Sequence, residues 1–180
     1  MLFGDSIIAG YGLDESDSLA VKLASSINKQ QPRVKVINAG VSGETTSAGL
    51  SRLAWSLKRN SPDIVLLALG GNDVLRGLNP ATTRNNLDAM LKILQAQDVQ
   101  VIFSKVQAPA NLGQEYIKQL DAVYTELAQK YDVPLYPFLL QDVFSKPHFM
   151  QRDGIHPNAA GVNIIAKSLG DYIIEFMADK

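Results

Sequence analysis

Cysteine is absent from this 180-residue chain, and neither a basic cluster nor a long apolar run is present. Without cysteine there can be no disulfide, no thiolate metal site and no cysteine nucleophile. The formal net charge of −1 is not the basic balance that binds nucleic acid. Apolar runs such as residues 64–69 are far shorter than the roughly 20 residues that a membrane helix needs. We therefore expect no nucleic-acid partner and no membrane span.

His, Asp and Glu residues nowhere have the spacing typical of metal ligands, so we expect no metal site. Hydrophobic residues make up 46% of the chain and charged residues 19%, which predicts a buried core rather than disorder. The length suits one domain over residues 1–180. The oligomeric state is not encoded in any pattern that we recognise, and a monomer is compatible with the sequence.

Only three residues precede the first turn, Gly4-Asp5-Ser6. A strand usually has about five residues, so we interpret residues 1–3 as the stub of a first strand. We expect that the natural protein begins further upstream or has lost a leader segment, although no signal peptide is recognisable here.

Strand-like and helix-like patterns alternate along the chain. This predicts an α/β fold, a three-layer α/β/α sandwich around a flavodoxin-like five-stranded parallel sheet of order 2-1-3-4-5. The predicted strands are residues 1–3, 33–38, 63–69, 99–105 and 135–137. The predicted helices are residues 16–30, 45–58, 79–97, 113–131 and 157–177, with a turn of helix at 138–144.

In such a sheet, ligands bind beyond the carboxyl ends of the strands, near strands 1 and 3. The loops after strands 1, 2 and 3 are all rich in glycine and polar residues, and they read Gly4-Asp5-Ser6, Asn38 to Thr45, and Gly70-Gly71-Asn72-Asp73. Each loop by itself is explained as well by an ordinary turn or helix cap. Together they predict a site at one edge of the sheet.

Ser6 is the candidate nucleophile, because a serine at a helix start is exposed and lies at the positive end of the helix dipole. The candidate base is His156, in Asp153-Gly154-Ile155-His156-Pro157. An Asp three residues before a His can accept a hydrogen bond from the imidazole, which leaves the second ring nitrogen for the serine. A helix-capping role for His156 is the alternative. The other histidine, His148, has no carboxylate nearby in sequence, which favours a surface or packing role.

The same loops offer donors for an oxyanion: the backbone N–H groups of Ser6 and Gly43 and the side-chain amide of Asn72. A turn residue is the alternative interpretation of Asn72. We expect Asp5 to brace its turn and Asp73 to order the third loop. Substrate-binding residues are predicted among the apolar residues of the later loops, with ordinary packing equally compatible: Val74, Leu75, Leu78, Pro109 and Ile155.

Other motifs are missing or incomplete. Gly-x-Ser-x-Gly, the nucleophile elbow of α/β-hydrolases, does not occur. Gly10-Tyr11-Gly12 lacks the third glycine of a dinucleotide-binding fingerprint.

Four segments, in order, resemble the four blocks of the SGNH (GDSL) hydrolases: Gly-Asp-Ser, the Gly43 loop, Gly-Gly-Asn-Asp and Asp-Gly-Ile-His-Pro. The functional Ser, Gly, Asn and His of that family fall on Ser6, Gly43, Asn72 and His156. Further segments, among them Ser42-Gly-Glu-Thr and Asp132-Val-Pro-Leu, resemble the bacterial multifunctional thioesterase I, arylesterase and lysophospholipase group. Ile8 departs from the family, which usually has a small polar residue there. We expect it to pack the first helix, and a more apolar pocket floor is the alternative.

The resemblance implies an esterase and thioesterase that acts on acyl chains without a cofactor. It also implies a periplasmic or secreted location, with a cytoplasmic one not excluded. We therefore predict a serine hydrolase that cleaves a small-molecule ester or thioester through an acyl-enzyme on Ser6. Two alternatives stay open: a carbohydrate acetylesterase of the same family, and a non-catalytic flavodoxin-like module that binds phosphate or nucleotide in its glycine loops.

Overall fold

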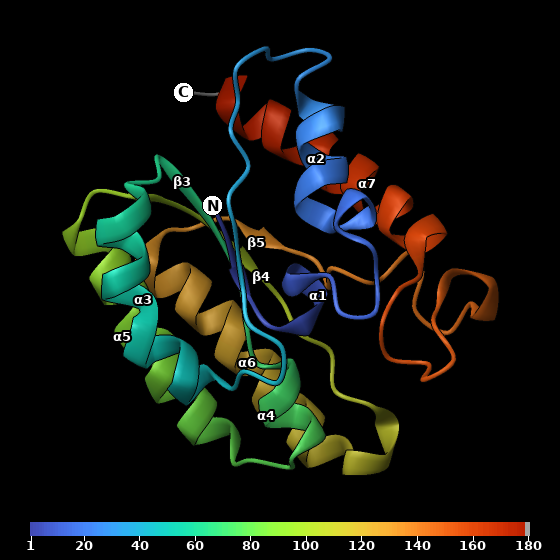
Figure 1. The fold of residues 1–180 in the computed structure, drawn as a ribbon. Helices are drawn as coiled ribbons and strands as arrows, with labels where there is room; N and C mark the ends of the chain where they lie inside the picture. Colours follow the sequence, from blue (N-terminus) through green and yellow to red (C-terminus); the bar gives the residue numbers. More distant parts are fainter. Residues whose placement is uncertain (179–180) are drawn as a thin grey trace.

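Five parallel strands form one sheet at the centre of the molecule, as the computed structural model shows for residues 1–178 (Figure 1). Their order is β2-β1-β3-β4-β5, which confirms the predicted topology. The strands are β1 (Leu2–Gly4), β2 (Asn38–Gly40), β3 (Ile64–Ala68), β4 (Gln100–Ser104) and β5 (Leu135–Tyr136).

Helices cover both faces of the sheet (Figure 1). The α-helices are α1 (Ser6–Ala9), α2 (Leu19–Ile27), α3 (Thr46–Asn60), α4 (Gly71–Leu75), α5 (Pro80–Ala96), α6 (Gln114–Tyr131) and α7 (Ala159–Ala178). Short 3₁₀ turns occupy Glu15–Asp17, Ala110–Leu112 and Pro147–Phe149. Helices α3, α5 and α6 lie on one side of the sheet, and α2 packs beside α7 on the other (Figure 1). No helix within residues 1–178 is both long enough and apolar enough to cross a membrane.

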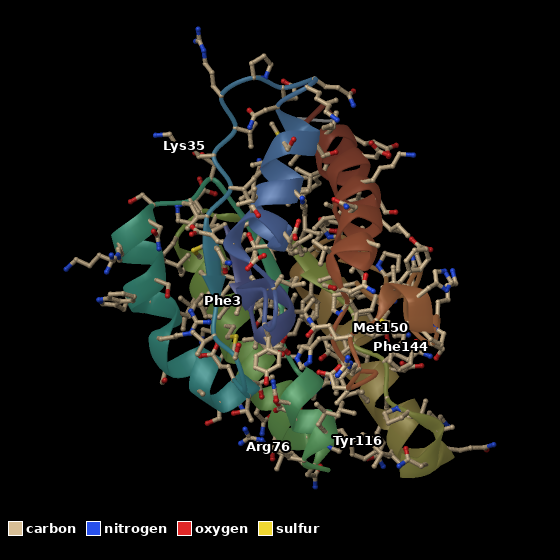
Figure 2. The ribbon with its side chains drawn as sticks, turned by 45° about the vertical axis from the view of Figure 1, so that its right-hand side comes forward. Phe3, Lys35, Arg76, Tyr116, Phe144 and Met150 are labelled. Carbon is tan, nitrogen blue, oxygen red and sulfur yellow. The ribbon has the colours of Figure 1, made fainter. Side chains whose placement is uncertain are left out.

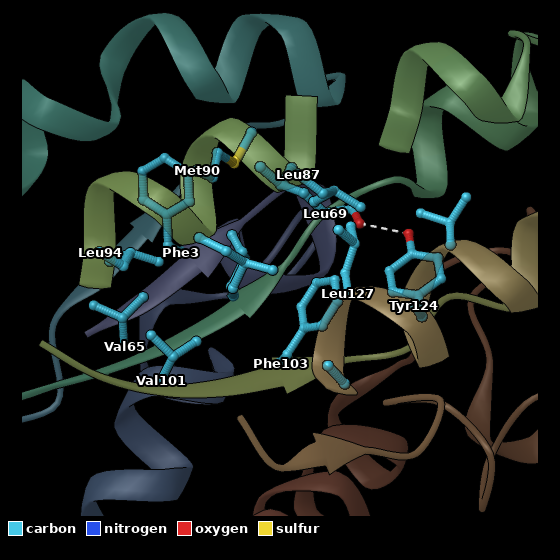
Figure 3. Close-up of a cluster of buried hydrophobic side chains, with 14 of the residues drawn as sticks. Phe3, Val65, Leu69, Leu87, Met90, Leu94, Val101, Phe103, Tyr124 and Leu127 are labelled. Carbon is cyan, nitrogen blue, oxygen red and sulfur yellow. Dashed lines mark hydrogen bonds between the residues drawn. The ribbon is translucent and has the colours of Figure 1, made fainter. Parts of the chain in front are cut away.

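Side chains of the strands alternate between two cores because successive strand residues point to opposite faces. Phe3, Leu67 and Phe103 belong to the core under α3, α5 and α6. Figure 3 shows Phe3 and Phe103 in this core. Leu2, Leu66 and Ile102 belong to the core under α2 and α7. Since both faces are covered, the central strands read as continuous apolar runs.

Several predicted boundaries of helices and strands are wrong. At these positions a local cap, or the lack of a partner strand, determines where the element begins or ends. Residues 33–37 are not in the sheet, because the ladder begins where Asn38 pairs with Leu2. The predicted helix at 16–30 is divided by Ser18, whose hydroxyl caps α2 by accepting from the Val21 N–H. The last helix opens after Asn158, which caps it by accepting from the Gly161 N–H, and not at Pro157. Residues 138–144 contain the predicted turn of helix only as one α-turn that is not continued, in which the Phe144 N–H donates to the Leu140 carbonyl oxygen at 2.7 Å.

Helix α1 lies very close to the sheet. A Cβ on Gly4 would stand 2.5 Å from the Ala68 carbonyl oxygen and from the Ile8 side chain. A Cβ on Gly40 would stand 2.2 Å from the Ala9 nitrogen, which is backbone and cannot turn away. Ile8 itself is fully buried, as expected for a residue that packs this helix. The position of α1, and with it of Ser6, therefore requires glycine at both strand ends.

We expect Gly40→Ala to lower the free energy of unfolding by about 1–3 kcal/mol, the usual range for overpacking a close contact. Urea denaturation measures this as a lower midpoint at unchanged slope. The control is Ser42→Ala, an exchange in the exposed loop that follows β2 and adds no atom. Equal midpoints for the two variants would contradict the close approach of α1.

Candidate active site

Ser6 is the first residue of α1, directly after the carboxyl end of β1. The Asp5 side chain caps this short helix, because its Oδ1 accepts from the Ile7 N–H at 3.1 Å. Gly10 ends the helix in a left-handed conformation with φ of 81°. The cap and the glycine thus hold one helical turn over the end of the sheet, with the Ser6 hydroxyl at its start.

His156 and Asp153 meet Ser6 from the opposite end of the sequence. The His156 Nε2 lies 2.8 Å from the Ser6 Oγ, and the His156 Nδ1 lies 2.7 Å from the Asp153 Oδ2. The second carboxylate oxygen of Asp153 accepts from the backbone N–H groups of Ile155 and His156, across the turn at Gly154. These hydrogen bonds, those from His156 first, lower the pKa of Asp153 to about 2. Asp153 is therefore ionised at any physiological pH.

The second and third loops lie against each other. The Asn72 side-chain nitrogen donates to the Glu44 carbonyl oxygen at 3.1 Å, and the Arg76 guanidinium donates to the Gly43 carbonyl oxygen at 2.9 Å. An amide nitrogen carries two N–H bonds, and this contact of Asn72 engages one of them. Gly43 has a φ of 79°, and the space where its Cβ would stand is empty. The side of the loop at Gly43 is thus open to a ligand.

The buried Asp73 carboxylate and the half-buried Arg52 guanidinium hold the second loop and the start of α3 in place. The Asp73 carboxylate accepts from the Thr46 N–H at 2.8 Å, from the Thr46 hydroxyl and from the Thr83 hydroxyl. Asp73 itself lies in the third loop, so these hydrogen bonds connect that loop to α3 and α5, as expected for a residue that orders it. The Arg52 guanidinium forms an ion pair with Glu44 and also donates to the Ala39 carbonyl oxygen, at the end of β2. The Arg52–Glu44 ion pair could not be predicted from the sequence, because the two side chains meet only when α3 packs against β2.

Tyr11 and Gln151 are two further residues beside His156 that sequence reasoning missed. The Tyr11 ring lies against the imidazole, with 4.6 Å between the ring centroids. The Gln151 side-chain nitrogen donates to the Tyr11 carbonyl oxygen at 2.7 Å. The only sequence signal was the unexplained Gly10-Tyr11-Gly12.

An apolar cavity of about 490 Å³ opens beside Ser6. Of the five predicted substrate-binding residues, Val74, Leu75, Pro109 and Ile155 line it. Leu78 is not among the residues that line this cavity, so the cavity does not support its predicted contact with substrate. Instead its carbonyl oxygen accepts from the Tyr116 hydroxyl, because the chain turns away after α4 to reach the cap of α5.

Much of the remaining wall comes from residues 104–110, at and after the end of β4, where Pro109 was the predicted residue. The turns after β5, which the sequence did not indicate directly, contribute Phe138, Leu139, Leu140 and Phe144. Figure 2 shows Phe144 in the half of the molecule that also holds Arg76 and Tyr116, whereas Lys35 lies in the other half. The sequence indicated these turns only indirectly, through the predicted strand β5. In a parallel sheet the carboxyl end of β5 lies at the same edge as that of β1, where Ser6 is found.

The other histidine, His148, is exposed and stacks on Phe149 with 4.0 Å between ring centroids, consistent with a surface or packing role. Within residues 1–178, no group of three or more His, Asp or Glu side chains is placed to hold a metal ion. Around Ser6, a hydroxyl, an imidazole and a carboxylate are hydrogen-bonded to one another in series. An apolar cavity and loops with backbone N–H groups lie beside them. Such a set can perform nucleophilic attack on a carbonyl carbon.

Asp5 is the second carboxylate near His156, and its environment differs from that of Asp153. It is buried, and the removal of water raises its pKa to about 6. The Ile7 N–H and the nearby His156 act in the opposite direction but do not overcome burial. Its hydrogen bond to α1 supports the expectation that it braces the turn.

Comparison with known proteins shows which described enzymes this chain is similar to. Residues 2–164 match the model of the GDSL-like lipase/acylhydrolase family. The "thioesterase 1/protease 1/lysophospholipase L1" of Escherichia coli K12 is 40% identical over 166 residues, which is 92% of this chain and 78% of that protein. An arylesterase of Vibrio mimicus is 33% identical over 98% of this chain and 88% of its own length. The crystal structure of the psychrotrophic esterase EstA from Pseudoalteromonas superposes with a TM-score of 0.93, at 30% identity, over 98% of this chain and 97% of that one.

We expect Asp5→Asn to stabilise the protein more at pH 7 than at pH 4. Asn keeps the capping oxygen but removes the buried charge. Because the folded pKa of about 6 lies above the ordinary value of 3.8, the unfolded state ionises first as pH rises. The wild type therefore loses stability between about pH 4 and pH 6, and the loss is complete above pH 6.

The measured quantity is the difference in unfolding free energy between Asp5→Asn and the wild type, from urea denaturation at both pH values. This difference should increase by on the order of 2–3 kcal/mol from pH 4 to pH 7. The same difference at the two pH values would show that Asp5 does not ionise in a buried site.

Proposed function

This chain belongs to the GDSL-like lipase/acylhydrolase family and is an ester hydrolase, and from that premise we propose that Ser6 is its nucleophile. The observation that carries the proposal is the continuous contact from the Ser6 Oγ to the His156 Nε2 at 2.8 Å, and from the His156 Nδ1 to Asp153 at 2.7 Å. A phosphate-binding module would have no use for this relay. Family membership sets aside the non-catalytic alternative.

In the proposed mechanism, the Ser6 Oγ attacks the acyl carbon while the His156 Nε2 takes the hydroxyl proton. Asp153 accepts the hydrogen bond from the Nδ1–H, which keeps the imidazole in the required tautomer and stabilises its charged form. The oxyanion is held by the Ser6 N–H, the Gly43 N–H and the second N–H of the Asn72 amide. Its empty side supports the role of Gly43.

The leaving alcohol or thiol then takes the proton from His156 and departs, which leaves an ester between the acyl group and Ser6. Water attacks this acyl-enzyme by the same route: His156 accepts a proton from water and returns it to the Ser6 Oγ. The acid product leaves and the resting state is restored. All proton transfers pass through one imidazole, so no cofactor is required.

The substrates that we propose are carboxylic esters and thioesters of acyl chains, including aryl esters and lysophospholipids. The support is the apolar cavity beside Ser6, whose volume of about 490 Å³ is in the range of small-molecule sites. The names of the relatives, a thioesterase and lysophospholipase and an arylesterase, point the same way. The family resemblance also supports a periplasmic or secreted location. A carbohydrate acetylesterase is the second candidate, and chain-length preference separates the two.

Ser6→Ala and His156→Ala should each lower the hydrolysis of p-nitrophenyl butyrate by at least about 10⁴-fold, because the hydroxyl and the base act as one unit. The other histidine supplies a matched control: His148→Ala should keep the rate within about twofold. A fluorophosphonate should label the wild type on Ser6, mapped by mass spectrometry. Label on another serine, or substantial turnover by Ser6→Ala with an unchanged circular dichroism spectrum, would refute the assignment.

We expect kcat/KM to rise at least tenfold from p-nitrophenyl acetate to the octanoate, because each buried methylene is worth about 0.8 kcal/mol. Ala110→Phe, which narrows the cavity, should lower the octanoate rate severalfold and spare the acetate. The same substitution at Ala54, exposed on α3, serves as the control. A preference for acetate, together with release of acetate from acetylated xylan, would favour the carbohydrate acetylesterase.

A further inference from the structure

Tyr11 lies on the imidazole of His156 although its side chain is largely exposed to solvent. The two ring centroids are 4.6 Å apart, with an angle of 39° between the ring planes. Tyr11 stays 53% exposed, so the contact is not a consequence of core packing. The mechanism described above assigns no task to this ring.

The backbone around Tyr11 is built to hold the ring in this place. Its N–H donates to the Ser6 carbonyl oxygen at 3.1 Å, which ties it to the helix of the nucleophile. The flanking glycines have φ values of 81° at Gly10 and 73° at Gly12, in the left-handed region that side chains disfavour. The turn between them therefore directs one aromatic side chain toward the histidine.

Gln151 joins this turn to the histidine segment. Its side-chain nitrogen donates to the carbonyl oxygens of Tyr11 at 2.7 Å and Pro157 at 3.0 Å, and its backbone N–H donates to the His156 carbonyl oxygen at 2.8 Å. The side chain also lies over Gly12, where a Cβ would stand 2.3 Å from the Gln151 Oε1. One residue thus connects the segments that carry the phenol ring and the imidazole.

We propose that the Tyr11 ring stabilises the imidazolium that His156 becomes on taking the Ser6 proton, and that Gln151 is the positioning residue that keeps the ring there. An aromatic face attracts a cation within about 6 Å of its centroid. The neutral imidazole is attracted less strongly than the imidazolium. The stabilisation is therefore largest after the proton has moved to His156, which lowers the barrier and increases the rate. The proposal depends on the proposed function in taking His156 as the base.

Other charged groups also act on His156, so the test must separate their effects from that of the ring. Asp153 accepts from the Nδ1, and Asp5 lies close enough beneath α1 for its charge to interact with His156. Both carboxylates are retained in every variant below. Each variant therefore changes only the ring or the amide that holds it.

Tyr11→Phe keeps the ring and is the matched control, whereas Tyr11→Leu keeps apolar cover without an aromatic face. We expect Tyr11→Leu to lower kcat by about two- to fivefold, on both p-nitrophenyl acetate and the butyrate, with KM unchanged. The acid limb of its kcat/KM profile should move to lower pH by about 0.4–0.7 pH unit, since the charged imidazole is less favoured. Tyr11→Phe should keep the wild-type kcat within about twofold and the wild-type pH profile.

Gln151→Met, similar in length but without the donor, should shift the acid limb in the same direction as Tyr11→Leu. In the double variant Tyr11→Leu with Gln151→Met, the second substitution should add little further effect, because the ring that Gln151 positions is already absent. Additive effects would overturn the role of Gln151. If the acid limb of Tyr11→Leu is not shifted, or if only its KM changes, the role of Tyr11 is overturned. Fluorophosphonate labelling of Ser6 in the same variant would then show that the nucleophile assignment still holds.

Discussion

The close approach of α1 to the carboxyl ends of β1 and β2 is the constraint on which the site depends. Glycine at positions 4 and 40 removes the two Cβ atoms that would stand within 2.5 Å of neighbouring backbone. The helix start that carries Ser6 therefore lies directly over the strand ends, between the loops after β2 and β3. If α1 were displaced outward, the hydroxyl would leave the reach of His156, which comes from a loop about 150 residues away in the chain.

Loops are usually mobile, yet the two loops beside Ser6 are held by hydrogen-bonded polar side chains that are buried, as Asp73 and Glu44 are, or half-buried, as Arg52 is. Asp73 binds the start of α3 through Thr46, and Arg52 returns from α3 to Glu44 and to the end of β2. A buried charge is costly unless it is paired and hydrogen-bonded. Within residues 1–178 every fully buried side-chain nitrogen and oxygen has such a partner. The polar network thus holds the backbone of the Gly43 loop in place without leaving an unsatisfied group.

Two aspartates flank the same histidine, and their environments separate their tasks. Asp153 accepts three hydrogen bonds near the surface, which hold its pKa at about 2. Asp5 is enclosed under α1, where loss of water raises its pKa to about 6. In the proposed mechanism the imidazole gains charge, which suits a neighbouring carboxylate that is always ionised, whereas a buried carboxylate suits a structural cap. The identity of the residue is the same in both places, so solvent and hydrogen bonds decide the role.

The sequence by itself determined the strand order, the three glycine-rich loops and the candidate set Ser6, Gly43, Asn72, Asp153 and His156, because apolar periodicity and turn residues are local signals. Only the tertiary structure decided which side chains meet across elements distant in the chain. The Arg52–Glu44 pair, the Gln151 bridge and the wall with Phe144 have no local signature. Residues 33–37 were mispredicted for the same reason, because β propensity needs a neighbouring strand, which the segment itself does not encode. Whether an apolar loop residue lines a cavity is likewise decided by its neighbours in space, and Leu78 does not line the cavity beside Ser6.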